Sequence, residues 1–133
     1  MSRTVRVRDR MRPGDLAVAW DDSAVAALSR MGDARLDAIP VVKDRRVIGL
    51  VERACCRRGG GWLGSVPVAS LMRRGVFVCR EGDALEHALA TMDRLEVDLL
   101  AVVDRVGRVV GVVGRDGDDG ALLRLVPALY SSY

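Results

Sequence analysis

Two stretches of the chain place apolar residues three and four positions apart, the spacing of a helix with one buried face. Their apolar positions are Ala24, Ala27, Leu28 and Met31 in the first stretch and Leu85, Ala88, Leu89, Met92 and Leu95 in the second. Asp22 and Asp83 precede these stretches, each followed by a small residue, and we expect them to cap the two helices.

After each helical stretch come two runs that are apolar at nearly every position. The runs cover residues 38–42 and 47–51, and then 99–103 and 109–113. Turn residues separate them at 44–45 and 105–107, so each pair of runs predicts a β-hairpin. Strands without polar alternation are typical of sheets that are covered on both faces. Short extended segments at 16–19 and 76–79, and short closing helices near 52–57 and 118–125, complete each unit.

The two units are copies of each other. At an offset of 61, the matching pairs include Met11 and Met72, Gly14 and Gly75, Asp22 and Asp83, Met31 and Met92, and Asp37 and Asp98. After the second turn the offset becomes 62, and Gly49 and Arg53 match Gly111 and Arg115. We place repeat one with its N-terminal lead segment at 1–58, a glycine-rich linker at 59–65, repeat two at 66–126 and a tail at 127–133.

The repeats predict an α/β (α+β) fold of two pseudo-symmetric β-α-β-β-α units. A three-stranded unit of this size cannot cover both faces of its own sheet. The two repeats are therefore expected to pack sheet against sheet, with helices outside, as one module.

Composition narrows the function. The 133 residues contain no apolar run long enough to span a membrane and no N-terminal signal peptide, so we expect a cytoplasmic protein. Three cysteines do not indicate a disulfide framework. The net charge is only +3 and aromatic residues are 4%, so the composition does not favour binding to nucleic acid. A lone His87 and no metal-ligand spacing predict neither an enzyme nor a metal site.

The order of elements, given twice, resembles the tandem cystathionine beta-synthase (CBS) domain pair, or Bateman module, of the stand-alone type. Residues 7–11 and 68–72 resemble its Val-x-Asp-x-Met motif, and residues 37–51 resemble its hairpin. The second hairpin has Ala101 where the family favours proline. The resemblance implies a non-enzymatic regulator that senses AMP, ATP or S-adenosylmethionine, forms a homodimer and modulates a protein partner.

The resemblance also implies a ligand cleft. In the family, a Gly-h-h-Thr/Ser-x-x-Asp motif (h, hydrophobic) holds phosphate and ribose. Here Glu52 and Cys55 occupy the two polar places in repeat one, and Gly114 and Gly117 occupy them in repeat two. These substitutions favour repeat two as the binding site, where Arg115 could reach a phosphate and Asp116 could shift to the ribose. The base would lie against the hairpin starts, whose residues are Ala38, Ile39 and Pro40, or Leu99, Leu100 and Ala101.

Two alternatives stay open. In the first, the clefts are degenerate and the module serves only dimerisation and protein interaction. The second is a nucleic-acid accessory protein, because Arg6, Arg8, Arg10 and Arg12 would share one face of an extended segment.

Overall fold

A computed structural model describes residues 4–57 and 65–115 of the chain. The first half contains α1 (Val7–Arg10), β1 (Arg12–Pro13), β2 (Val18–Ala19), α2 (Ala24–Ala34), β3 (Ala38–Lys43), β4 (Arg46–Glu52) and α3 (Arg53–Arg57). The second half contains the 3-10 helix η2 (Val68–Ser70), β5 (Arg73–Arg74), β6 (Val78–Arg80), α4 (Leu85–Leu95), β7 (Leu99–Val103) and β8 (Val109–Gly114). The mixed α/β class is thus confirmed. None of the described helices is long and apolar enough to cross a membrane.

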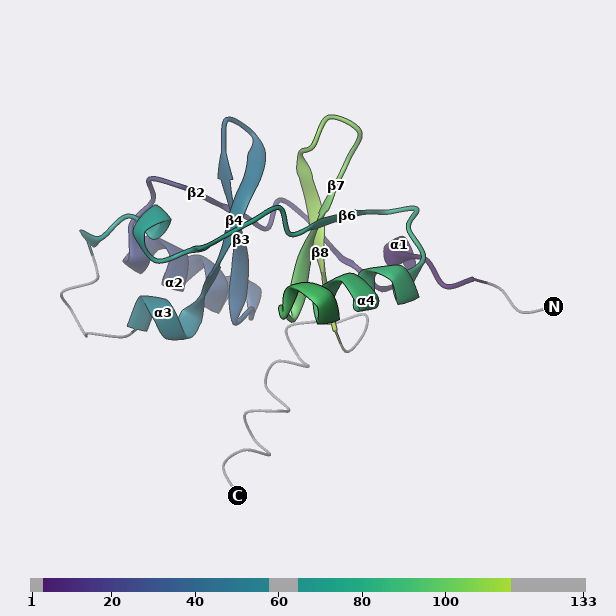
Figure 1. Ribbon diagram of the computed structural model, residues 1–133. Helices are drawn as coiled ribbons and strands as arrows, with labels where there is room; N and C mark the ends of the chain where they lie inside the picture. The colour runs from purple at the N-terminus through teal and green to yellow at the C-terminus, as the bar shows by residue number, and fades with distance from the viewer. Residues whose placement is uncertain (1–3, 58–64, 116–133) are drawn as a thin grey trace, which may run out of the picture.

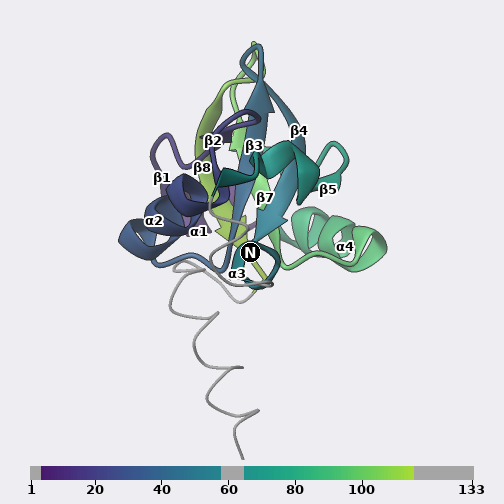
Figure 2. The ribbon, with the colours of Figure 1, turned by 90° about the vertical axis from the view of Figure 1, so that its left-hand side faces the viewer.

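The elements form two four-stranded sheets, in the orders β2-β3-β4-β5 and β1-β8-β7-β6. The hairpins β3–β4 and β7–β8 stand next to each other, and α2 and α4 lie on opposite sides of the molecule (Figures 1 and 2). The first four residues of β3 and all of β7 are buried. Val47, Ala101 and Val103 form an apolar cluster that joins the hairpins. The expected packing of one repeat's sheet on the other is therefore present.

Each sheet has one strand more than the three we expected, because the repeats exchange their lead segments. The first lead segment, residues 5–13, adds β1 to the sheet of the second repeat, where it pairs with β8. The backbone N–H of Val7 donates to the Asp83 carbonyl at 2.8 Å, and that of Arg8 donates to Glu81 at 3.0 Å. The Val7 side chain is completely buried. This lead segment thus packs into a core to which both halves contribute.

The second lead segment, residues 66–74, makes the reciprocal connection. It adds β5 to the first sheet, beside β4. The N–H of Val68 donates to the Asp22 carbonyl at 2.8 Å, and that of Ala69 donates to Trp20 at 3.0 Å. Val68, which matches Val7 at the offset of 61, is also completely buried. Neither sheet is complete without a segment from the other half.

The extended arginine strip predicted for residues 6–12 is wrong. Residues 7–10 form the helix α1, which contacts α4 and β6. The Arg6 guanidinium donates to the Gly82 carbonyl at 2.7 Å. Backbone hydrogen bonds to the second half decide the conformation here, and they override the alternation of arginine and apolar residues.

The helix caps lie one residue later than predicted. Asp22 and Asp83 each accept a hydrogen bond, at 2.9 Å, from the backbone N–H three residues earlier, so they close the turn before the helix. Ser23 and Ala84 are the N-cap residues, and the Ser23 hydroxyl accepts from the N–H of Ala26 at 3.1 Å. The closing helix α3 is confirmed. The second closing helix, expected at 118–125, most of the linker and the tail lie outside the described residues.

Gly49 and Gly111 are required where the exchanged strands approach. A Cβ atom on Gly111 would lie 2.5 Å from the carbonyl oxygen of Arg12, and one on Gly49 would lie 2.7 Å from that of Arg73. Both contacts are with backbone, which cannot swing away as a flexible side chain can. The two glycines therefore let β1 and β5 join the partner sheets.

We expect Gly111→Ala to lower the free energy of unfolding by about 1–3 kcal/mol, the usual cost of overpacking. Gly32→Ala is the matched control, because Gly32 is helical and no atom lies within 4 Å of its added Cβ. That variant should gain up to about 1 kcal/mol from helix propensity. Urea unfolding measures both changes, and an unaltered midpoint for Gly111→Ala would contradict the required close approach.

Candidate functional site

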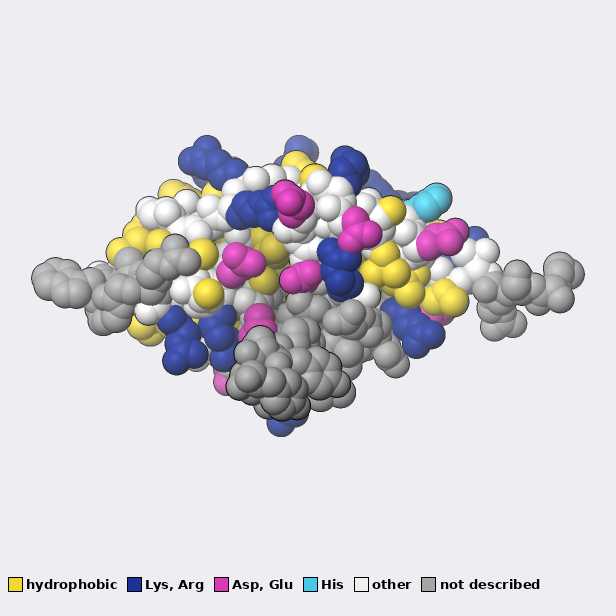
Figure 3. Space-filling model, turned by 60° about the horizontal axis from the view of Figure 1, so that its bottom comes forward, with side chains coloured by type: hydrophobic (Ala, Val, Ile, Leu, Met, Phe, Trp, Pro, Cys, Tyr) yellow, Lys and Arg dark blue, Asp and Glu magenta, His cyan; other side chains and the backbone are white. Residues whose placement is uncertain are grey.

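A cavity of about 330 Å³ lies at the end of the first hairpin. It is lined by Asp37, Glu52, Arg53, Ala54 and Arg57. Glu52 ends β4 and is exposed, and the next residues form α3. On the face of the molecule shown in Figure 3, acidic and basic side chains lie next to each other rather than in separate patches. The cavity therefore offers both signs of charge to a ligand.

An ion pair between Arg53 and Asp37 lies at one side of this cavity. The Arg53 backbone N–H donates to the Asp37 carbonyl at 2.7 Å, and its guanidinium donates to the Leu36 carbonyl at 3.1 Å. The Nε atom of Arg53 lies 3.6 Å from Oδ1 of Asp37. This ion pair joins the segment before β3 to the start of α3, and the two charges offset each other.

Arg115 repeats this arrangement in the second half. Its backbone N–H donates to the Asp98 carbonyl at 3.0 Å, and its guanidinium donates to the Asp98 carboxylate and the Val97 carbonyl, each at 3.0 Å. Asp93, on α4, accepts a further hydrogen bond from this guanidinium. The hydrogen bonds to Asp93 and Asp98 raise the pKa of Arg115. A phosphate placed here would have to compete with two carboxylates for this guanidinium.

The sequence analysis did not predict the two Asp–Arg ion pairs, although the alignment of the repeats contains a signal for them. Asp37 matches Asp98, and Arg53 matches Arg115, in the alignment of the two repeats. A duplicated pair of opposite charges that brackets a hairpin is a candidate ion pair. Asp93 had no such signal, because its contact depends on how α4 packs.

The predicted base-reading residues are the buried starts of β3 and β7. Their members are Ala38, Ile39 and Pro40, and Leu99, Leu100 and Ala101. In the first sheet, β2 pairs with β3 only at Val41 and Val42, so no strand covers this edge at the start of β3 among the described residues. In the second sheet, the Ala101 N–H donates to the Phe77 carbonyl at 2.8 Å. That donor is thus already used inside the protein.

The remaining predicted site positions lie near the hairpin ends. Cys55 is half-buried on α3. Gly114 is buried and pairs with Leu99 at the end of β8, whereas Asp116 and Gly117 lie outside the described residues. Within the described ranges, no group of three or more His, Cys, Asp or Glu side chains is placed to hold a metal ion.

Burial makes the other two cysteines poor nucleophiles. It raises the pKa of the Cys79 thiol to about 12, and the carboxylate of Asp83 adds to the shift. Burial also raises the pKa of Cys56. Both thiols are therefore protonated at neutral pH, and their role is packing.

We expect Arg115→Gln to lower the free energy of unfolding by about 1 kcal/mol, because an ion pair with a partly exposed arginine contributes modestly. Arg94→Gln is the control, since Arg94 is an exposed arginine on α4. Urea unfolding at low and at high salt provides the test. The difference between the variants should shrink at high salt, and equal stability at low salt would refute a structural role for Arg115.

Comparisons with known proteins agree with this fold. The sequence model of the CBS domain matches residues 7–55 and again residues 68–116. Protein MJ1004 of Methanocaldococcus jannaschii is similar in structure, with a TM-score of 0.74 and 22% identity over 95% of this chain. This chain spans 61% of that protein's length.

Two further structures contain bound ligands. The CBS domain pair of protein MJ0100, in complex with 5'-methylthioadenosine and S-adenosyl-L-methionine, has a TM-score of 0.74 and 18% identity, covering 96% of this chain and 99% of that one. The CBS domain of a bacterial CNNM/CorC family Mg2+ transporter, in complex with ATP, has a TM-score of 0.69 and 20% identity, covering 92% of this chain and 87% of that one.

Proposed function

We propose, because the chain belongs to the CBS domain family, that it is a non-enzymatic regulatory module that binds an adenosine-containing small molecule. We place the binding site at the start of the first hairpin rather than in repeat two, which the sequence favoured, because Asp93, Asp98 and the Val97 carbonyl already accept hydrogen bonds from Arg115. Occupancy of this cleft changes how the module acts on a protein partner. The observation that carries the proposal is the cavity beside Glu52, at the junction of β4 and α3. Its volume lies at the lower end of the range for small-molecule pockets.

The charges of this cavity favour one class of adenosine compound. Asp37 and Arg53 offset each other at 3.6 Å. Glu52 and Arg57 are exposed, and neither side chain forms a hydrogen bond or an ion pair within the described part of the chain. A triphosphate would place negative charge beside Glu52, which is unfavourable. A ligand with both signs of charge, such as S-adenosylmethionine, matches Glu52 with its cationic groups and Arg57 with its carboxylate.

Isothermal titration of the full chain with S-adenosylmethionine, 5'-methylthioadenosine and ATP tests the proposal. We expect S-adenosylmethionine to bind more tightly than ATP. Glu52→Gln should weaken the binding of S-adenosylmethionine about fivefold, because one exposed ion pair with the ligand is lost. The ratio of the affinities for S-adenosylmethionine and ATP should therefore fall.

Glu86→Gln is the matched control, because Glu86 is an exposed glutamate in the first turn of α4 and does not line the cavity. It should leave both affinities unchanged. Tighter binding of ATP than of S-adenosylmethionine, or equal effects of the two Glu→Gln variants, would contradict the proposed ligand class.

A second candidate is a ligand-free module for homodimerisation and protein interaction. It is favoured by the residues at the family's polar positions, which are Glu52 and Cys55 in one repeat and Gly114 in the other, and by the hydrogen bonds that occupy Arg115. A dimeric mass by light scattering, with no heat of binding for any of the three ligands, would favour this candidate.

A nucleic-acid role has less support. Of the four arginines that suggested it, Arg8 and Arg10 lie on the docked helix α1, and the Arg6 guanidinium donates to the Gly82 carbonyl. They do not form one extended basic edge.

A further inference from the structure

A second cavity lies at the opposite end of the hairpins from α3. It measures about 450 Å³ and is lined by Asp15, Val42, Arg45, Arg108 and Val109. Figure 1 shows the hairpin turns at the top of the molecule and α3 below. This cavity is therefore separate from the cleft beside Glu52.

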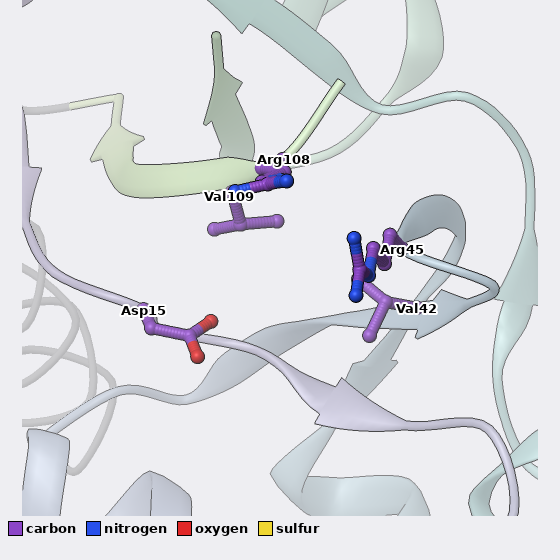
Figure 4. A pocket seen from close by; sticks show the side chains of 5 residues that line it. All are labelled: Asp15, Val42, Arg45, Arg108 and Val109. Carbon is purple, nitrogen blue, oxygen red and sulfur yellow. The ribbon is translucent and has the colours of Figure 1, made fainter. Parts of the chain in front are cut away.

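The two arginines of this cavity come from different hairpins. Arg45 lies in the β3–β4 turn, and Arg108 immediately precedes β8. Their side chains extend over the same space, with the Asp15 carboxylate across from them (Figure 4). Neither guanidinium forms a hydrogen bond or an ion pair within residues 4–57 and 65–115. Two cations that share one cavity repel each other. Among the described residues Asp15 is the carboxylate that lines the cavity, and Asp104 interacts electrostatically with Arg108.

The backbone holds both arginines in place. Asp44 and Arg45 have φ values of 51° and 66°, so the first turn has the left-handed conformation of a tight hairpin. In the second turn, the Arg108 N–H donates to the Asp104 carboxylate at 2.9 Å, and the Val106 N–H donates to it at 3.0 Å. These hydrogen bonds, that of Arg108 first, lower the pKa of Asp104. The turn therefore stays closed at neutral pH.

The rest of the lining adds an apolar floor and a hydrogen-bond acceptor. Val42 and Val109 pack against the cluster that joins the two hairpins, so a ligand here would touch both repeats. Asp15 lies in the loop between β1 and β2, and the Arg30 guanidinium donates to its backbone carbonyl. That contact holds the loop without using the Asp15 carboxylate.

We propose that this cavity binds a small phosphorylated polyhydroxy compound. Arg45 and Arg108 hold its phosphate, Asp15 accepts hydrogen bonds from its hydroxyl groups, and the two valines contact its carbon chain. Guanidinium groups suit phosphate because they donate paired, charge-assisted hydrogen bonds. Arg108 matches Arg46 in the repeat, whereas the residues matching Arg45 are not arginine, so the site arises from a difference between the repeats.

Titration of the full chain with glycerol 3-phosphate, with glycerol as the uncharged comparison, tests this site. We expect saturable binding of glycerol 3-phosphate and none of glycerol. The double variant Arg45→Gln with Arg108→Gln should weaken binding by at least about tenfold, because charge-assisted hydrogen bonds are lost. Arg46→Gln is the matched control, being an exposed arginine of the same hairpin that does not line the cavity.

Asp15→Ala tests the hydroxyl contact through a ratio of affinities. Losing the negative charge should alter the binding of glycerol 3-phosphate and of inorganic phosphate in the same direction. Losing the acceptor affects glycerol 3-phosphate alone, so its affinity relative to phosphate should fall. Glu52→Gln should change neither, which separates this site from the adenosine cleft. An absence of saturable glycerol 3-phosphate binding, or equal binding by the double variant and Arg46→Gln, would overturn the proposal.

Discussion

Each half of this chain completes its sheet with a strand from the segment that leads into the other half. Val7 and Val68 anchor the two exchanges: both are fully buried, and the backbone N–H of each donates to a carbonyl of the opposite repeat. Burying one valine contributes about 1.5–3 kcal/mol, a large fraction of a small domain's net stability. Neither repeat can therefore reach its native packing alone, and the two must fold as one unit.

This constraint also positions the candidate sites. The exchange holds the hairpins next to each other, so their starts and their turns become two separate ends of one structure. At the starts, Arg53 pairs with Asp37 beside the cleft, and Arg115 makes the matching ion pair with Asp98 in the second half. At the turns, Arg45 and Arg108 line one cavity although they are distant in sequence and do not match in the repeat. The residues that the two repeats share thus build the fold, and the residues in which they differ give the candidate sites their charges.

The sequence predicts the hairpins and the long helices well, because their apolar spacing reflects burial within each repeat. It fails at residues 6–12, where hydrogen bonds to Glu81, Gly82 and Asp83 make a helix of a segment whose alternation looks extended. The sequence carries only a weak signal for the exchange of lead segments, because the residues of such a segment do not specify which of the two sheets it joins. The sequence carries no signal that Arg45 and Arg108 line one cavity, because this depends on the distance between two turns in space.

Native-state hydrogen exchange of the full chain tests the reciprocal exchange most directly. The amides of Val7 and Val68 donate to carbonyls in the opposite half, so they should exchange only when the whole molecule unfolds. Both amides should show the free energy of global unfolding measured in urea. A markedly lower value for either amide, with the other half still protected, would mean that the halves are independently stable and do not depend on the reciprocal exchange.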